Sequence, residues 1–212
     1  MNSSAQARLT SNPTTLDPAL ITDVIGGSIS AKLFNGLVRF NENLEIVPDI
    51  ARSWKLSGDQ TTYTFRLRND VTFSNGRKVT AEDVRYSFER VLTPATRAPI
   101  TWVLDKIAGA NDFLAGKAKA VSGIRVIDDY TLAIRLDKPF GPFLSLLAMS
   151  AAYVVPREDV ERLGQDFGFT PAVIGGCVLL YAASLLLDPS GVGMNGIFGL
   201  LSPSTKSLFL LG

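Results

Sequence analysis

Histidine is absent from this 212-residue chain, and cysteine occurs only once, at Cys177. Without histidine, the commonest general base and the commonest metal ligand are missing, and Ser-His-Asp and Cys-His catalytic arrangements are excluded. A single cysteine cannot form an internal disulfide. The composition therefore speaks against hydrolytic enzymes that use histidine and against histidine-based metal sites.

An excess of charge of either sign is also missing. The chain has 21 Lys and Arg against 20 Asp and Glu, a net charge of +1. This balance gives no support for a nucleic-acid or anionic-membrane partner, since both usually require a basic excess. The first ten residues, MNSSAQARLT, contain no apolar run of the roughly 7–15 residues that a secretory signal needs. We therefore expect a protein that stays inside the cell, or one whose signal lies upstream of this chain.

Two motifs resemble cofactor-binding motifs, but each lacks neighbouring residues that binding would require. Residues 191–196 (GVGMNG) match the dinucleotide pattern G-x-G-x-x-G, but no acidic residue follows Asp188 and Pro203 would soon end a helix. Gly116-Lys117 is not a phosphate-binding loop, because neither Ser nor Thr follows the lysine. The neighbouring acids Glu82 and Asp83 are typical of a helix start rather than of a catalytic pair. We therefore predict no catalytic residue, no metal ligand and no cofactor.

Charged residues nearly vanish after Asp166. The only charged residues in 167–212 are Asp188 and Lys206. The sequence thus divides into residues 1–166 and a divergent apolar tail, 167–212, whose apolar segment 170–187 is borderline for the 18–20 residues that span a bilayer. Three interpretations of the tail are open: a membrane anchor, a buried core segment, and the product of a shifted reading frame.

In the first part of the chain, the helix signals are interrupted. Asp17-Pro18 predicts a helix start, because Asp can cap a helix and Pro suits its first position. Gly26-Gly27 is expected to break that helix, and residues 28–34 to form a second piece. Residues 37–40 then predict a short strand.

A strand, a turn and a helix follow in quick succession. Tyr63, Phe65 and Leu67 alternate with polar residues, which indicates a half-buried strand. Asn75-Gly76 predicts a type I′ turn. Thr80 and Asp83 fit a capping box. The helix that starts there has one apolar stripe and is stopped by a proline: Val84, Phe88, Val91, Leu92 and Pro94.

The remaining pattern predicts a second β-hairpin over residues 124–136, a short buried helix over 143–149 and an exposed helix over 156–163. Strands and helices alternate without a regular βαβ rhythm, so the predicted class is α/β with at least one mixed sheet. Trp54 is expected in the core. Trp102 lies in a loop bounded by prolines, where an aromatic side chain could line a cleft; the alternative is packing in the core or on the surface.

Together these segments are similar to a known family. The stretches "LFNGLVRFNENLEIVPDIARSWKLSGDQTTYTFRLRNDVTFSNGRKVTAEDVRYSFERVL" and "VSGIRVIDDYTLAIRLDKPFGPFLSLLAM" resemble the family 5 extracellular solute-binding proteins, the peptide-binding components of ABC importers. The resemblance runs from about residue 12 to about residue 167. It implies a periplasmic-binding-protein-like fold of type II: two lobes, a small extra domain, and a cleft that closes on the solute by a hinge motion.

The resemblance also implies a function. Members of the family are not enzymes; they bind a peptide or another solute and deliver it to an ABC permease, from the periplasm or as lipid-anchored proteins outside the cell. The segment after "LDPA" resembles a strip that faces the cleft, which makes Thr22, Asp23 and Val24 candidate ligand contacts, with Trp102 a weaker one. The alternative for Asp23 is a surface acid at a helix turn.

The sequence also departs from this family. Its members are usually more than twice as long, and their second lobe has no counterpart here, so we expect a truncated form with weak or no binding. After "GQDFG" the family continues with a motif like Gly-Thr-Gly-Pro-Phe, which is missing, and the shifted reading frame is therefore the favoured interpretation of the tail. Sequencing the gene tests this: finding that motif in another frame supports it, and its absence contradicts it. The competing function is a membrane-anchored interaction protein that uses segment 170–187.

Overall fold

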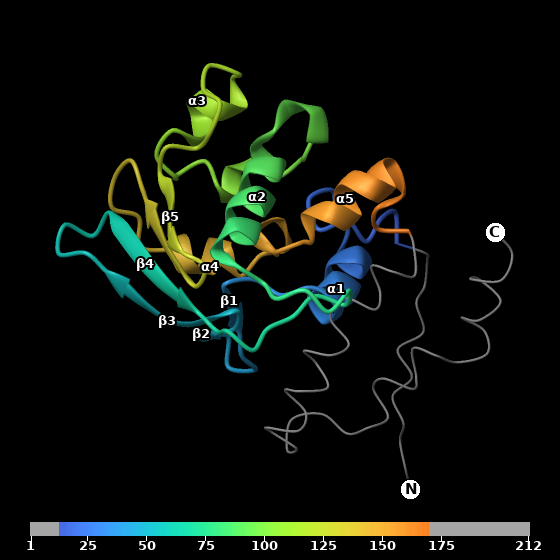
Figure 1. Ribbon diagram of the computed structural model, residues 1–212, viewed down its shortest axis with the longest axis horizontal. Coiled ribbons are helices and arrows are strands. Elements are labelled where there is room, and N and C mark those ends of the chain that lie inside the picture. Colours follow the sequence, from blue (N-terminus) through green and yellow to red (C-terminus); the bar gives the residue numbers. More distant parts are fainter. Residues whose placement is uncertain (1–12, 170–212) are drawn as a thin grey trace, which may run out of the picture.

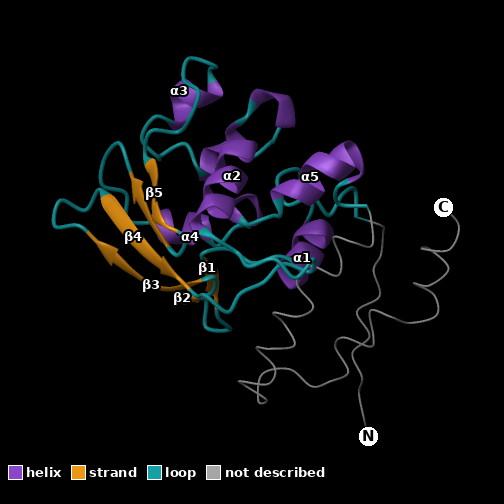
Figure 2. Cartoon of the chain, viewed as in Figure 1, coloured by secondary structure: helices purple, strands orange, loops and turns teal. Residues whose placement is uncertain are grey.

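The computed structural model describes residues 13–169 of the chain (Figures 1 and 2). The α-helices are α1 (Val24–Leu33), α2 (Ala81–Leu92), α3 (Ala110–Leu114), α4 (Phe143–Leu147) and α5 (Arg157–Leu163). The strands are β1 (Val38–Phe40), β2 (Ile46–Pro48), β3 (Ala51–Leu56), β4 (Thr62–Leu67), β5 (Ile124–Asp128) and β6 (Thr131–Arg135). The described residues also form four short 3₁₀ helices: η1 (Pro94–Thr96), η2 (Thr101–Val103), η3 (Ser150–Ala152) and η4 (Gly164–Asp166).

The strands form two sheets. β1 pairs with β2, and the larger sheet has the order β3-β4-β6-β5. Every strand pair within residues 13–169 is antiparallel. The predicted α/β class is confirmed, but the expected mixed sheet is wrong for residues 13–169, because both sheets there are purely antiparallel. The hairpin predicted over 124–136 is the β5–β6 pair, and the strand predicted from Tyr63, Phe65 and Leu67 is β4.

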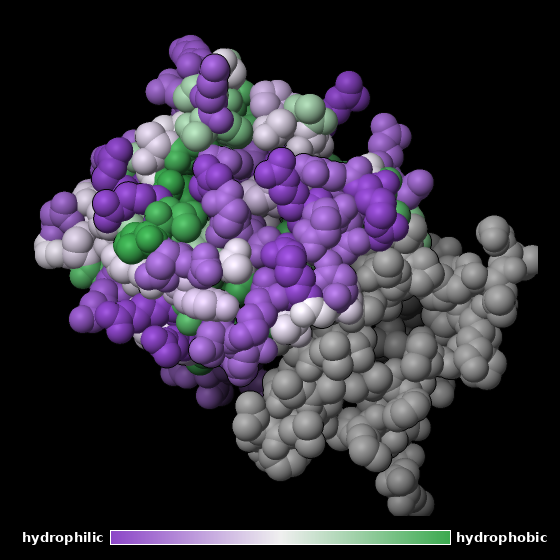
Figure 3. Space-filling model, in the orientation of Figure 1, coloured by the Kyte–Doolittle hydropathy of each residue, from purple (hydrophilic) through white to green (hydrophobic). Residues whose placement is uncertain are grey.

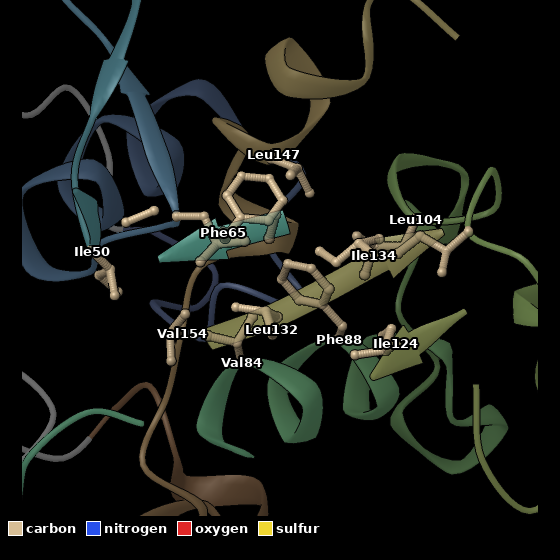
Figure 4. Packing of buried hydrophobic residues seen from close by; sticks show 14 of the residues in the cluster. Ile50, Phe65, Val84, Phe88, Leu104, Ile124, Leu132, Ile134, Leu147 and Val154 are labelled. Carbon is tan, nitrogen blue, oxygen red and sulfur yellow. The ribbon is translucent and has the colours of Figure 1, made fainter. Parts of the chain in front are cut away.

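The main core lies between the larger sheet and the helices on one of its faces. Phe65, Leu132 and Ile134 from the strands meet Val84 and Phe88 from α2 (Figure 4), and all five are fully buried. Complete burial of such a side chain stabilises the fold by about 1.5–3 kcal/mol. The apolar stripe predicted for α2 is thus confirmed as the face that meets the sheet.

α4 covers the same face of the sheet. The ring of Phe143 lies 5.3 Å from that of Tyr63 on β4. The helix predicted over 143–149 is confirmed, although it ends at Leu147. Trp54, expected in the core, is only partly buried, with its ring 6.5 Å from that of Phe65. Figure 3 shows hydrophilic residues over most of the visible surface of the described part, with smaller hydrophobic groups between them.

The turn between Phe73 and Arg77 differs from the predicted type I′. A type I′ turn needs positive φ at both central residues. Only Gly76 has one, at 84°, and Asn75 does not. The Phe73 N–H donates to the Arg77 carbonyl (2.8 Å) and the Gly76 N–H to the Phe73 carbonyl (3.0 Å). This is a three-residue hairpin loop, in which a glycine at positive φ follows an ordinary turn.

The helix start after the turn is as predicted. The Thr80 N–H donates to Asp83 Oδ2 at 2.8 Å, which is one half of the capping box. α2 ends at Leu92, two residues before Pro94. α5, predicted over 156–163, is confirmed with Pro156 as its N-cap residue.

The first helix was predicted wrongly. Asp17-Pro18 begins a turn, in which the Leu20 N–H donates to the Asp17 carbonyl (2.9 Å), and no helix follows it directly. α1 begins only at Val24 and runs through Gly26 and Gly27 without a break. Glycine weakens a helix but does not forbid it, and here the cap and tertiary packing outweigh its low propensity.

We expect Gly27→Ala to stabilise the protein by about 0.5–1 kcal/mol, because alanine costs less backbone entropy in a helix. A Cβ at Gly27 would meet no atom within 4 Å. Gly26→Ala is the matched control: its Cβ would lie 3.0 Å from Asp23 Oδ2 and 3.2 Å from the Thr15 carbonyl oxygen. Urea denaturation of both variants measures the difference, and a lower midpoint for Gly27→Ala than for the wild type would contradict the expectation.

Candidate ligand-contact segment

The segment that leads into α1 is anchored at its start by Asp17. This carboxylate is only 2% exposed and forms a bidentate ion pair with Arg90 of α2, with 2.8 Å between Oδ1 and Nη1. Its Oδ1 also accepts from the Ala19 N–H (3.1 Å). Ile21, two residues on, is buried. The chain is therefore fixed on the protein immediately before the residues predicted to contact the ligand.

Asp23 fixes the other end of the segment as the N-cap of α1. Its Oδ1 accepts from the Gly26 N–H at 2.6 Å, and its Oδ2 accepts from the Thr14 hydroxyl at 2.9 Å. These hydrogen bonds, chiefly the one from Gly26, lower the pKa of Asp23, because they favour the charged carboxylate. The side chain of Asp23 thus caps the helix, and only its backbone remains as a candidate ligand contact beside the exposed residues.

On either side of Asp23, Thr22 and Val24 face solvent, and Val24 is 85% exposed. Trp102, on η2, is 49% exposed. The short helix η3 contacts both α1 and η2. The structure therefore presents three of the predicted contacts at the surface: Thr22 just before α1, Val24 at the start of α1, and Trp102 on η2.

The ends of the described unit meet at this same place. The Leu16 N–H donates to the Gly168 carbonyl (3.3 Å), and the Arg90 guanidinium lies 5.4 Å from the centre of the Phe167 ring. Phe167, the first residue of the predicted tail, is buried beside Phe34 in a small second cluster. The rest of the tail interpretation, including segment 170–187, the motif at 191–196 and Cys177, lies outside the described residues.

Nothing in the sequence indicated a cluster of charged side chains around Arg77. Arg77, just after the turn, donates to Asp83 (2.7 Å) and to Glu158 of α5 (2.7 Å), and the Asn75 side chain also donates to Glu158 (2.7 Å). The partners Arg77 and Glu158 are 81 residues apart, so no local pattern reveals the pair. The cluster fixes α5 to the turn and to the start of α2.

This cluster makes a pH-dependent contribution to stability. Hydrogen bonds from Arg77 lower the pKa of Glu158 from 4.5 to about 2. Because the pKa is lower in the folded state, the contribution is complete above pH 4.5 and is lost as the pH falls towards 2. We expect Glu158→Gln to be less stable than the wild type at pH 7, with a difference that disappears between pH 4.5 and 2.

Urea denaturation at a series of pH values measures this effect. In an Arg77→Met background the same substitution of Glu158 should show a much weaker pH dependence, since the main donor that lowers the pKa is gone and the Asn75 side chain remains. A difference between wild type and Glu158→Gln that stays constant down to pH 2 would contradict the assignment.

Within residues 13–169 no group of three potential metal ligands comes together. Over the same residues, no helix combines the length and the hydropathy that crossing a membrane requires.

Comparison with known proteins identifies the family. Residues 45–175 match the family described as bacterial extracellular solute-binding proteins, family 5 middle. The match covers more than half of the chain and extends past the predicted break at residue 166.

Relatives and solved structures agree with this match. The chain is 39% identical over 152 residues to the periplasmic murein peptide-binding protein MppA of Escherichia coli, covering 70% of this chain and 28% of MppA. It is 36% identical over 155 residues to the periplasmic oligopeptide-binding protein OppA of the same organism, covering 72% of this chain and 28% of OppA. The structure of Listeria monocytogenes OppA bound to peptide has a TM-score of 0.73 and 31% identity, covering 76% of this chain and 32% of that one. The chain thus spans under a third of the length of these relatives, and it belongs to the family 5 bacterial extracellular solute-binding proteins.

Proposed function

We propose that this chain is part of a solute-binding component of an ABC importer that takes peptides and passes them to a membrane permease. The observation that carries the proposal is the family match over residues 45–175, together with relatives named for binding oligopeptides and murein peptides. The proposed location is the periplasm, as in the names of those relatives, or the outer side of the cell membrane. The proposed partners are a peptide and the permease subunits.

The candidate contacts are Thr22, Val24 and Trp102, with the backbone of Asp23. Extended peptides are held in such proteins largely through main-chain hydrogen bonds, as when a strand is added to a sheet. An exposed segment that is fixed at both ends, by Asp17 and by the α1 cap, offers backbone groups that need little ordering on binding. The exposed Trp102 ring offers apolar area for a peptide side chain.

We expect weak binding, because the chain covers only 28% of the length of OppA and so supplies only part of such a cleft. Calorimetric titration of the full chain with di- to pentapeptides measures the affinity. A dissociation constant in the micromolar range or tighter would contradict this expectation, although not the assignment as a binding protein.

The two tryptophans provide a site-specific test. Trp102 lies among the proposed contacts, whereas Trp54 lies on β3 beside Phe65. In ¹H–¹⁵N spectra each tryptophan gives an indole N–H signal, which Trp54→Phe and Trp102→Phe variants assign. Peptide at millimolar concentration should shift the Trp102 signal and leave the Trp54 signal in place. Equal shifts of both signals, or of neither, would contradict the proposed site.

A further inference from the structure

Basic side chains dominate the larger sheet. Its four strands carry one acidic residue, Asp128, and these basic ones: Arg52, Lys55, Arg66, Arg125 and Arg135. The net charge of +1 for the whole chain conceals this local asymmetry.

The strand register brings four of these cations onto one face. Tyr63 and Phe65 of β4 point into the core, so Thr64 and Arg66 alternate with them toward the opposite, outer face. Residues paired directly across antiparallel strands point to the same side. Lys55 of β3 pairs with Thr64, which places it on the outer face as well.

The other two strands extend the same face. Ala133 of β6 pairs with Thr64 on one side and with Arg125 of β5 on the other. Arg135 pairs with Thr62 of β4. Lys55, Arg66, Arg125 and Arg135 therefore share the outer face, and we call this set the cationic sheet face.

The cationic sheet face extends over all four strands of the larger sheet. Lys55, Thr64, Ala133 and Arg125 form one row across all four strands, about 15 Å long at the usual spacing of strands. Arg66 and Arg135 lie on opposite sides of this row, because β4 and β6 are antiparallel. The cations therefore surround small side chains and do not converge on a single point.

None of these four cations is neutralised within the described part of the chain. All four are exposed, and none takes part in the ion pairs found between residues 13 and 169. The neighbouring acids are at the turns and have other donors: Asp59 accepts from the Thr61 hydroxyl (2.8 Å) and Asp128 from the Tyr130 N–H (2.8 Å).

We propose that the cationic sheet face is a docking surface for the anionic headgroups of a phospholipid bilayer. Guanidinium groups match phosphate oxygens in a fork geometry, and cations spread over a whole sheet face fit a surface of many anions. Protein interfaces usually have an apolar or aromatic centre, whereas the centre here is Thr64 and Ala133. The exposed apolar residues of these strands, Leu56 and Ile127, lie on the edge strands β3 and β5.

The test is co-sedimentation of the full chain with vesicles of phosphatidylcholine alone and of phosphatidylcholine with phosphatidylglycerol in equal parts. The neutral vesicles measure any binding that does not depend on charge. We expect stronger binding to the anionic vesicles, and a decrease in that excess as salt is added. Each basic residue removed should lower the excess about fivefold. The variant with Lys55→Gln, Arg66→Gln, Arg125→Gln and Arg135→Gln should therefore bind both vesicle types equally.

A matched variant controls for net charge. It replaces four exposed lysines outside the larger sheet by glutamine: Lys32, Lys78, Lys117 and Lys119. This control variant should keep most of its stronger binding to the anionic vesicles. Thermal melting followed by circular dichroism shows whether each variant is folded. Equal losses in the two variants would overturn the proposal, as would equal binding of the wild type to both vesicle types. Retention on a polyglutamate resin without binding to vesicles would also overturn it, in favour of an acidic protein partner.

Discussion

Arg90→Ala is expected to lower the free energy of unfolding by about 3–5 kcal/mol, which is the usual cost of breaking a buried ion pair. The side chain of Arg90 is 13% exposed and that of its partner Asp17 is 2% exposed. Removal of the guanidinium leaves a buried carboxylate without its counter-charge, and it also removes the cation that lies 5.4 Å from the Phe167 ring. Urea denaturation at neutral pH measures the change.

The same helix provides the control. Arg85 pairs with Glu82 on the exposed side of α2, where the side chains are 37% and 51% exposed. Exposed pairs of this kind contribute about 0–1 kcal/mol, so Arg85→Ala should change stability little. If the buried charge is the cause, adding Asp17→Asn to Arg90→Ala should restore part of the loss, since Asn keeps an acceptor for the Ala19 N–H. An Arg90→Ala variant no less stable than Arg85→Ala would refute this account.

Gly123→Ala is expected to cost about 3 kcal/mol, at the upper end for overpacking, because backbone surrounds the glycine. The Gly123 N–H donates to the Ala108 carbonyl, and the Gly123 carbonyl accepts from the Arg135 N–H, both at 2.8 Å. A Cβ would lie 2.6 Å from the Arg135 carbonyl oxygen and 2.7 Å from that of Ala108. Neither atom is the end of a flexible side chain, so the backbone itself would have to move.

Gly141→Ala serves as the comparison, because a Cβ there would meet no atom within 4 Å. It should leave the urea midpoint almost unchanged, while Gly123→Ala lowers it strongly or prevents accumulation of folded protein. A midpoint for Gly123→Ala within error of that for Gly141→Ala would contradict tight backbone packing around Gly123.

Local chemistry made part of this structure predictable. The alternation of Tyr63, Phe65 and Leu67 specified β4, and the capping box of Thr80 and Asp83 specified the start of α2. In both cases the deciding interactions lie within a few residues of one another. The family, too, was recognisable from the sequence, since the stretches that resemble it include this strand, turn and helix.

Other features depend on contacts between distant parts of the chain. Arg90 and Asp17 are 73 residues apart, and the pairing between them holds the segment that sequence alone assigned to a helix at Asp17. Gly123 looks like an ordinary turn glycine until Ala108 and Arg135 are placed beside it. For the candidate contacts, the sequence indicated Thr22, Asp23 and Val24 as a group. Only the folded structure separates the exposed Thr22 and Val24 from Asp23, which caps α1.

The meeting of residues 15–17 with residues 167–169 has a mechanical consequence. Because the two ends of this unit lie against each other, a pull between them does not stretch the sheet along its strands. The force acts first on the Leu16–Gly168 hydrogen bond and on the Arg90–Asp17 ion pair, which would break one after the other. A force of that kind, applied by anything attached at both ends, would release these contacts while the core around Phe65 and Phe88 stays intact.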